Sequence, residues 1–137
     1  MKTYLDTSAL IKLVVAEPES PALRTYLGTI AGDTLFTAAL TRTELIRAVR
    51  GVDAVSASRS RHLLDGLATV NLTTSLLDAA ALLEPPLLRS LDAIHLAAAQ
   101  RAGADLRAVI TYDVRMAEAA ALLTIPVVAP TASDQSG

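Results

Sequence analysis

Short apolar segments alternate with helix-like segments along this chain, and that alternation restricts its fold more than any other feature. The segments of strand type are residues 3–5, 34–37, 70–72, 108–112 and 125–129. Strands separated by helices pair in parallel, because a parallel connection needs a crossover that is usually a helix. The alternation therefore predicts an α/β fold of three layers, with a mostly parallel sheet of about five strands flanked by helices on both faces.

The segments between the strands carry apolar residues at helical spacing. In the second helical segment the apolar residues follow the pattern i, i+3, i+4 and i+7. They are Leu23, Tyr26, Leu27 and Ile30. Ser20 and Pro21 precede them and predict an N-cap and a first helical residue. The other expected helices are one that follows the first strand and those at residues 41–50, 53–68, 76–83, 90–102 and 116–123.

The composition indicates one small domain with an aliphatic core. The chain has 137 residues, of which 52% are hydrophobic and only 3% aromatic, so Ala, Leu, Val and Ile must fill the core. Residues 1–130 are expected to form the domain. Residues 131–137 form a polar C-terminal segment, which we expect to be disordered.

The cysteine and histidine counts exclude several kinds of site. The chain has no cysteine and two histidines, so it has no thiol nucleophile and few ligands for zinc. Lys12 follows Asp6 closely, so neither a signal peptide nor a membrane span is expected at the start of the chain. We therefore expect a soluble, cytoplasmic protein.

The charge balance bears on nucleic-acid binding in two ways. The formal net charge of −2 argues against a broadly basic, phosphate-binding surface. However, ten of the twelve basic residues are Arg, which suits bidentate phosphate contacts, and two bound Mg²⁺ ions would change the charge from −2 to +2. A GC-rich genome explains the excess of Arg equally well.

Four acidic residues stand where helices begin. Asp6 and Asp113 directly follow the first and fourth expected strands, whereas Glu44 and Asp92 are placed in the first turns of helices. Taken one at a time, each is explained by helix capping or by the helix dipole. A separate reason is therefore needed to regard the four acids as one site.

That reason is their convergence in the expected fold. Sites of parallel sheets lie at the carboxyl ends of the strands, and the ends of the first and fourth strands are expected to be neighbours. A like-charge pair at about 4 Å costs about 4 kcal/mol at an effective dielectric of 20, which exceeds the gain of about 1 kcal/mol from a cap. Four gathered carboxylates would therefore hold a hard cation, Mg²⁺ or Mn²⁺, and support metal-assisted hydrolysis of a phosphodiester.

Two hydroxyl residues lie beside these acids. Ser8 is two residues after Asp6, and Thr111 is two residues before Asp113. Their hydroxyls either orient the metal ligands and a water molecule, or satisfy backbone groups at the turns. We include Ser8 and Thr111 in the candidate site as supporting residues.

The acids lie in four short segments, YLDTSAL at 4–10, TRTEL at 41–45, LDAIHLA at 91–97 and TYD at 111–113. In order and spacing these segments resemble the PIN-domain toxins of the VapC family. The resemblance runs from about Lys2 to about Val128. The first and third segments together are fairly specific, whereas any one segment is weak.

The resemblance implies a fold, an activity and partners. It implies a Mg²⁺-dependent endoribonuclease whose catalytic and metal-binding residues are Asp6, Glu44, Asp92 and Asp113. It further implies a structured RNA substrate, often tRNA or ribosomal RNA, a homodimer, and a cognate antitoxin protein whose tail enters the acidic cleft. The role as the toxin of a toxin–antitoxin pair is likewise an implication of the family.

Three other residues near the acids have more than one interpretation. His95 invites assignment as a general base, but its place in an apolar helix favours a structural role with a local hydrogen bond. Arg89 and Arg115 flank two of the acids. They either contact substrate phosphate or lie on solvated helix surfaces.

Two other functions are compatible with acids at strand ends. A phosphatase or receiver domain that accepts a phosphoryl group has an acid after its first strand, but the phosphatase needs a second Asp where this chain has Ser8. A receiver also needs a late Lys, and neither Lys2 nor Lys12 is late. The third function is that of a non-catalytic protein that keeps the PIN scaffold and only binds partners. The intact set of four acids argues against it, because the acids would repel one another without any catalytic benefit.

Overall fold

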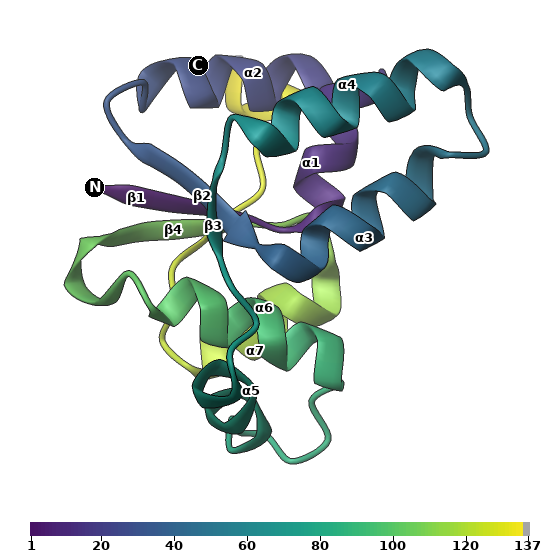
Figure 1. The fold of residues 1–137 in the computed structure, drawn as a ribbon. Helices are drawn as coiled ribbons and strands as arrows, with labels where there is room; N and C mark the ends of the chain where they lie inside the picture. The colour runs from purple at the N-terminus through teal and green to yellow at the C-terminus, as the bar shows by residue number, and fades with distance from the viewer. Residues whose placement is uncertain (136–137) are drawn as a thin grey trace.

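The computed structural model of the protein describes residues 1–135. Along the chain the elements are β1 (Lys2–Leu5), α1 (Thr7–Val14), α2 (Ser20–Thr29), β2 (Thr34–Ala38), α3 (Ala39–Val49), α4 (Ala54–Asp65), β3 (Ala68–Val70), α5 (Thr74–Ala81), α6 (Ser90–Gln100), η1 (Gly103–Asp105), β4 (Leu106–Ile110), α7 (Val114–Leu122), β5 (Val127–Val128) and η2 (Ala132–Gln135) (Figure 1).

All five strands form one parallel sheet in the order β3-β2-β1-β4-β5. The chain adds β2 and β3 on one side of β1, and then crosses to add β4 and β5 on the other side. The strand order therefore reverses between β1 and β4, which is where open parallel sheets place their sites. The predicted α/β fold with a parallel sheet is confirmed.

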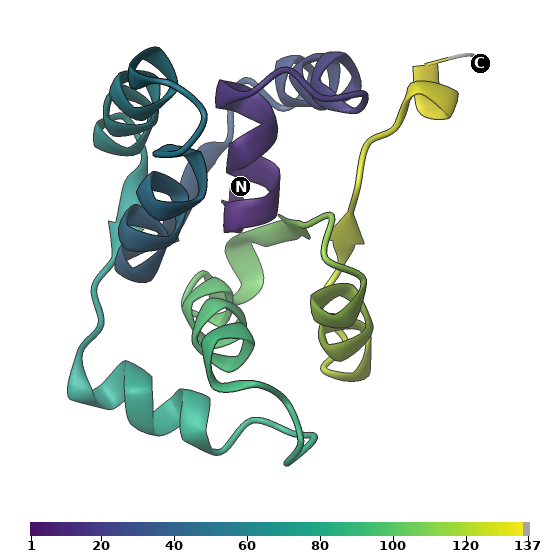
Figure 2. The ribbon, with the colours of Figure 1, turned by 90° about the vertical axis from the view of Figure 1, so that its right-hand side faces the viewer.

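Helices cover both faces of the sheet because its strands are apolar on both faces. Helices α1 to α4 pack on one face and α5 to α7 on the other (Figures 1 and 2). Successive side chains of a strand point to opposite faces, so Tyr4 joins the core under α6 while Leu5 joins the core under α1. Val109 and Ile110 divide in the same way.

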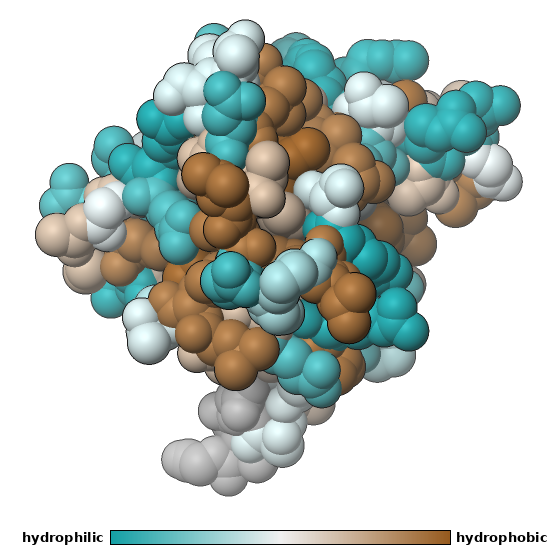
Figure 3. All heavy atoms as spheres, turned by 90° about the horizontal axis from the view of Figure 1, so that it is seen from below, coloured by the Kyte–Doolittle hydropathy of each residue, from teal (hydrophilic) through white to brown (hydrophobic). Residues whose placement is uncertain are grey.

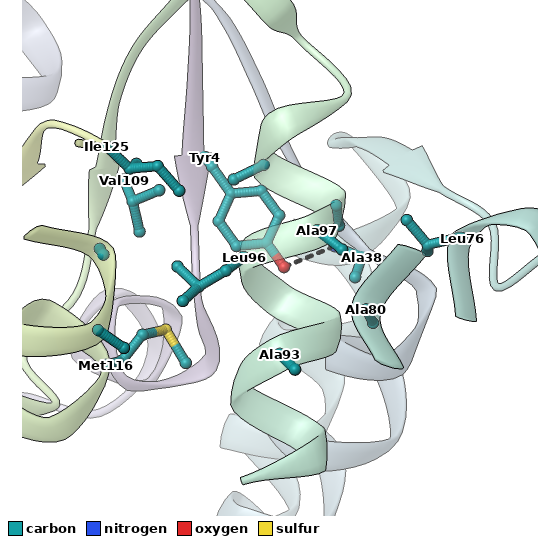
Figure 4. Close-up of a cluster of buried hydrophobic side chains, with 14 of the residues drawn as sticks. Tyr4, Ala38, Leu76, Ala80, Ala93, Leu96, Ala97, Val109, Met116 and Ile125 are labelled. Carbon is teal, nitrogen blue, oxygen red and sulfur yellow. Dashed lines mark hydrogen bonds between the residues drawn. The ribbon is translucent and has the colours of Figure 1, made fainter. Parts of the chain in front are cut away.

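The core beside α5, α6 and α7 is built around Tyr4 and many small side chains. Alanine residues make up much of the buried face of α6, and they let this helix lie close to the sheet. Figure 4 shows the Tyr4 ring among these residues, with its hydroxyl directed to Ala38. A polar group therefore lies inside an otherwise apolar core, and it has a hydrogen-bond partner there.

At the opposite edge from the strand ends, Asp33 joins the starts of three strands. It accepts hydrogen bonds from Thr3 Oγ1 at 2.8 Å and from Arg107 Nε and Nη2 at 2.6 and 3.0 Å. The α-amino group of Met1 lies 3.6 Å away. Contact with the Arg107 guanidinium holds the pKa of Asp33 well below its usual value.

Several helices and strands begin or end at other residues than the sequence predicts. Strand β3 occupies 68–70 instead of 70–72, because Gly66 ends α4 early and Ala68 then pairs with Phe36. Helix α3 begins at Ala39, so Glu44 lies beyond the first turn and the expected interaction with that turn's dipole is wrong.

The N-cap of α2 is Glu19 and not Ser20. Ser20 is the first residue of this helix, and its hydroxyl donates a hydrogen bond to the Val15 carbonyl. The same hydroxyl accepts one from the Glu17 amide. Ser20 therefore closes the turn between α1 and α2 instead of capping α2.

The C-terminal segment includes η2 at Ala132–Gln135. The domain limit at residue 130 and the disorder of residues 131–137 stay predictions, and residues 136–137 lie outside the described part of the chain. Within residues 1–135, no helix has the length and apolar character needed to cross a membrane.

Candidate active site

The carboxyl ends of β1 and β4 bring Asp6 and the segment 111–113 together. Leu5 pairs with Ile110 in the sheet, and the Asp6 amide continues the pairing by donating to the Ile110 carbonyl at 3.3 Å. Figure 2 looks onto this edge of the sheet, where α1 and α7 start. The expected adjacency of the first and fourth strand ends is therefore present.

Asp6 is a buried carboxylate with several hydrogen-bond donors. One oxygen, Oδ1, accepts from Ser8 Oγ at 2.7 Å and from the Ala9 amide at 3.0 Å, which caps α1. The other, Oδ2, accepts from Thr111 Oγ1 at 2.5 Å. Burial raises the pKa of Asp6, and the three donors offset only part of that effect. Ionised Asp6 is therefore costly without a nearby positive charge.

Thr111 and Ser8 hold the two strand ends in register. The Thr111 hydroxyl donates to Asp6 and accepts from the Asp113 amide at 3.0 Å. The Ser8 hydroxyl donates to Asp6 and accepts from the Tyr112 amide at 2.9 Å. Each hydroxyl therefore contacts the candidate acid Asp6 and also satisfies a backbone amide.

Arg89 lies between Asp92 and Asp113. Its Nε donates to Asp92 Oδ2 at 3.1 Å, and its Nη2 lies 3.7 Å from Asp113 Oδ2. Asp92 is buried in the first turn of α6, as expected. The other oxygen of Asp113 caps α7 by accepting from the amides of Arg115 and Met116. One guanidinium therefore lies against two of the four acids, and its single positive charge offsets one of their two negative charges.

Glu44 is held from two sides through the same oxygen. Its Oε1 accepts from Thr7 Oγ1 at 2.6 Å and lies 2.6 Å from His95 Nε2. Burial raises the pKa of Glu44, but the hydrogen bonds from His95 and Thr7 outweigh this effect and leave the pKa below its usual value. Thr7 was not among the expected site residues, although it belongs to the same DTS segment as Asp6.

Contacts and one turn of α6 connect the candidate residues along this edge. In order, the path runs through Asp6, Thr111, Asp113, Arg89, Asp92, His95, Glu44 and Thr7. The link from Asp92 to His95 is one turn of α6. Asp92 and Asp113 therefore share a partner, whereas Asp6 and Glu44 have separate sets of donors.

Within residues 1–135, no three acidic or histidine side chains are arranged to hold one metal ion. The chemistry of the donors fits a hard divalent cation, because the acids of this edge offer only carboxylate oxygens. A positive group already lies between Asp92 and Asp113 in the form of Arg89. Positive charge therefore already lies between these two carboxylates.

A hollow of about 210 Å³ opens beside Asp92. Its walls come from the loop before α6 and from α7, and include Leu88, Ala119 and Leu122. Arg89 and Arg115 also line it. The acidic edge therefore continues into a depression that carries two guanidinium groups.

The comparisons with known proteins identify the family. Residues 3–122 match the family described as "PIN domain". The chain is 45% identical over 128 residues to ribonuclease VapC46 of Mycobacterium tuberculosis, and the match covers 93% of this chain and 97% of that protein. The chain is a PIN-domain protein of the VapC family. Ribonuclease VapC47 of the same species is 46% identical over 82% of this chain and 85% of its own.

Solved structures agree with the VapC-family fold. VapC20 of M. tuberculosis, described as a sarcin–ricin loop cleaving toxin, superposes with a TM-score of 0.70 at 14% identity, over 85% of this chain and 94% of its own. A toxin–antitoxin complex from Klebsiella pneumoniae gives a TM-score of 0.68 at 23% identity, over 93% and 97% of the two chains. At such low identity these two structures support the PIN fold alone.

Proposed function

We propose that this protein is a Mg²⁺-dependent endoribonuclease and the toxin of a toxin–antitoxin pair. The observation that carries the proposal is that Asp6, Asp92 and Asp113 lie at the edge where the strand order reverses, linked through Thr111 and Arg89. Glu44 of α3 joins them through its contact with His95 of α6. Relatives that are 45% and 46% identical over most of this chain are named ribonucleases, which supports the same activity here.

The four acids are the proposed catalytic and metal-binding residues. A bound Mg²⁺, or Mn²⁺ in its place, supplies positive charge to the scissile phosphate and makes water a better nucleophile. Asp6 gains most from such a charge, because burial holds its pKa above the usual value. Ser8 and Thr111 keep the Asp6 carboxylate in one orientation. Glu44, with its pKa lowered, stays ionised at neutral pH.

Arg89 and Arg115 are the proposed contacts to RNA phosphate. Both side chains line the hollow beside Asp92, and Arg89 is more than half exposed. A guanidinium that pairs with two carboxylates in the free protein can exchange them for phosphate oxygens when those carboxylates bind a cation. This exchange places the substrate backbone next to the acids.

The proposed partners are an RNA, an antitoxin and a second copy of the chain. A structured RNA such as tRNA or ribosomal RNA, and a location in the cytoplasm, follow from the family. Structures of related fold include complexes of toxin with antitoxin, which supports an antitoxin partner. Apolar residues gather on the face formed by α5 and α6 (Figure 3), where Leu82, Leu87 and Leu91 are at least half exposed, and this supports a homodimer.

Cleavage of cellular RNA by the purified, antitoxin-free protein tests the proposal. With Mg²⁺ we expect discrete new RNA ends, which EDTA abolishes and added Mg²⁺ or Mn²⁺ restores. Asp92→Asn should abolish cleavage. Asp78→Asn is the matched control, because Asp78 is an exposed acid on α5 away from the site, and it should cleave like the wild type. Absence of cleavage with either metal would instead support a scaffold that acts by binding only.

A further inference from the structure

A buried chain of hydrogen bonds lies behind Glu44. The Ala38 amide donates to Tyr4 Oη at 3.2 Å, and Tyr4 Oη lies 2.6 Å from His95 Nδ1. The opposite ring nitrogen, Nε2, lies 2.6 Å from Glu44 Oε1. Tyr4 is fully buried and His95 is 2% exposed. Four elements, β2, β1, α6 and α3, therefore meet through these polar atoms.

The two ends of this series of hydrogen bonds restrict where its hydrogens can lie. A backbone amide only donates, so Tyr4 Oη accepts at that end and has its own hydrogen available for His95 Nδ1. An ionised carboxylate only accepts, so the hydrogen between His95 and Glu44 belongs to Nε2. Both constraints are satisfied together when the ring hydrogen is on Nε2 and Nδ1 accepts from Tyr4.

The two oxygens of Glu44 differ in their partners. Oε1 receives two donors, Thr7 and His95, from different helices. No hydrogen bond within residues 1–135 reaches Oε2, and the side chain is 25% exposed. One oxygen is therefore anchored in the protein, and the other is available to a ligand.

We propose that Tyr4 and His95 are positioning residues that hold Glu44 Oε1 through the Nε2 hydrogen of His95 and so present Oε2 to the cation and the substrate. This inference rests on the proposed catalytic role of Glu44. A Glu side chain loses rotamer freedom when it is fixed, and a buried donor that fixes it in advance removes that cost from the binding step. A misplacement of about 1 Å in such a site costs on the order of a hundredfold in rate.

Nitrogen NMR of the imidazole tests the proton positions without any cleavage assay. We expect a hydrogen on His95 Nε2 and none on Nδ1. The signal should move in Tyr4→Phe, which removes the partner of Nδ1, and in Glu44→Gln, which replaces the charged acceptor at Nε2 by a neutral amide. A ring with hydrogen on Nδ1, or on both nitrogens, would overturn the assignment.

Two amide variants separate positioning from packing. In His95→Gln the amide nitrogen replaces Nε2 and can still donate to Glu44, whereas in His95→Asn the shorter amide replaces Nδ1 and cannot reach Glu44. Both remove the ring from the same core, so their losses of thermal stability should be similar. We expect kcat to fall about 10- to 100-fold in His95→Asn and to recover largely in His95→Gln.

The outcomes distinguish this inference from the proposed function. Equal losses of kcat in the two variants, in step with their stability, would overturn the positioning role and leave the nuclease proposal intact. If the wild type cleaves no RNA, the proposed function fails, and the tautomer measured by NMR still decides the hydrogen-bond assignment.

Discussion

Replacing Thr111 by Val tests how the two central strand ends are joined. Thr111 is buried, and its hydroxyl donates to Asp6 at 2.5 Å and accepts from the Asp113 amide. Val has nearly the same shape but cannot donate or accept. The substitution therefore removes the hydroxyl from between the two acids while it keeps the packing.

The magnitude follows from the charge of the acceptor. A hydrogen bond to an ionised group contributes about 1.5–3 kcal/mol, whereas one between neutral groups contributes about 1 kcal/mol. The Asp113 amide is part-buried, so water replaces part of its lost partner. We expect Thr111→Val to lower the free energy of unfolding by about 2–3 kcal/mol at pH 7 without metal.

The loss should depend on pH in a defined direction. Donation from Thr111 lowers the pKa of Asp6, so its removal raises that pKa further. Once the pH falls below the pKa of Asp6, the carboxyl is neutral in both proteins and the hydrogen bond is worth less. The difference between Thr111→Val and the wild type should therefore shrink as the pH falls.

Urea unfolding in EDTA at several pH values measures this difference. Thr111→Ser is the control, because it keeps the hydroxyl and loses one buried methyl group at a cost of about 1 kcal/mol that does not depend on pH. If Thr111→Val is no less stable than Thr111→Ser at pH 7, or if its loss is the same at all pH values, this account of the site is wrong.

Three further predictions follow from the charges. Burial raises the pKa of Asp6, so the metal-free wild type should lose stability as the pH rises from about 4 through that pKa. Asp6→Asn keeps a helix cap, so it should lose this pH dependence and cleave no RNA. Urea unfolding in EDTA and the cleavage assay check both expectations. Arg107 lowers the pKa of Asp33, so Asp33 should stabilise the fold above about pH 4 and lose this effect as the pH falls; Asp33→Asn should have a flatter acid limb in melts between pH 2 and 5. Arg115→Gln should raise KM for RNA several-fold with kcat unchanged, an effect that high salt should reduce, and steady-state kinetics at two salt concentrations check it.

The sequence predicts the α/β fold because the alternation of strands and helices leaves few arrangements. It also predicts that Asp6 and Asp113 lie close, since both follow strands of one parallel sheet. Boundaries set by pairing are harder to predict, and β3 is the example. Its residues Ala68 and Thr69 are not strongly apolar, and only their pairing with β2 makes them a strand.

The partners of the acids are less predictable than their positions. Tyr4 and His95 are separated by 91 residues, and nothing in either segment indicates that they meet. The structural role expected for His95 agrees with its burial, although its partners are side chains of distant elements and not a local group. Arg89 is similar, because its contact with Asp113 depends on how α6 and α7 pack.

We propose that the acids at the ends of β1 and β4 and on α3 and α6 hold a divalent cation. Anomalous diffraction from crystals soaked in Mn²⁺ tests it directly. We predict an anomalous peak about 2.1 Å from carboxylate oxygens of Asp6, Asp92 or Asp113, which is the distance of an octahedral site. The Arg89 side chain should then have moved away from its position between Asp92 and Asp113. A peak only at other residues, or none at saturating Mn²⁺, would contradict the account.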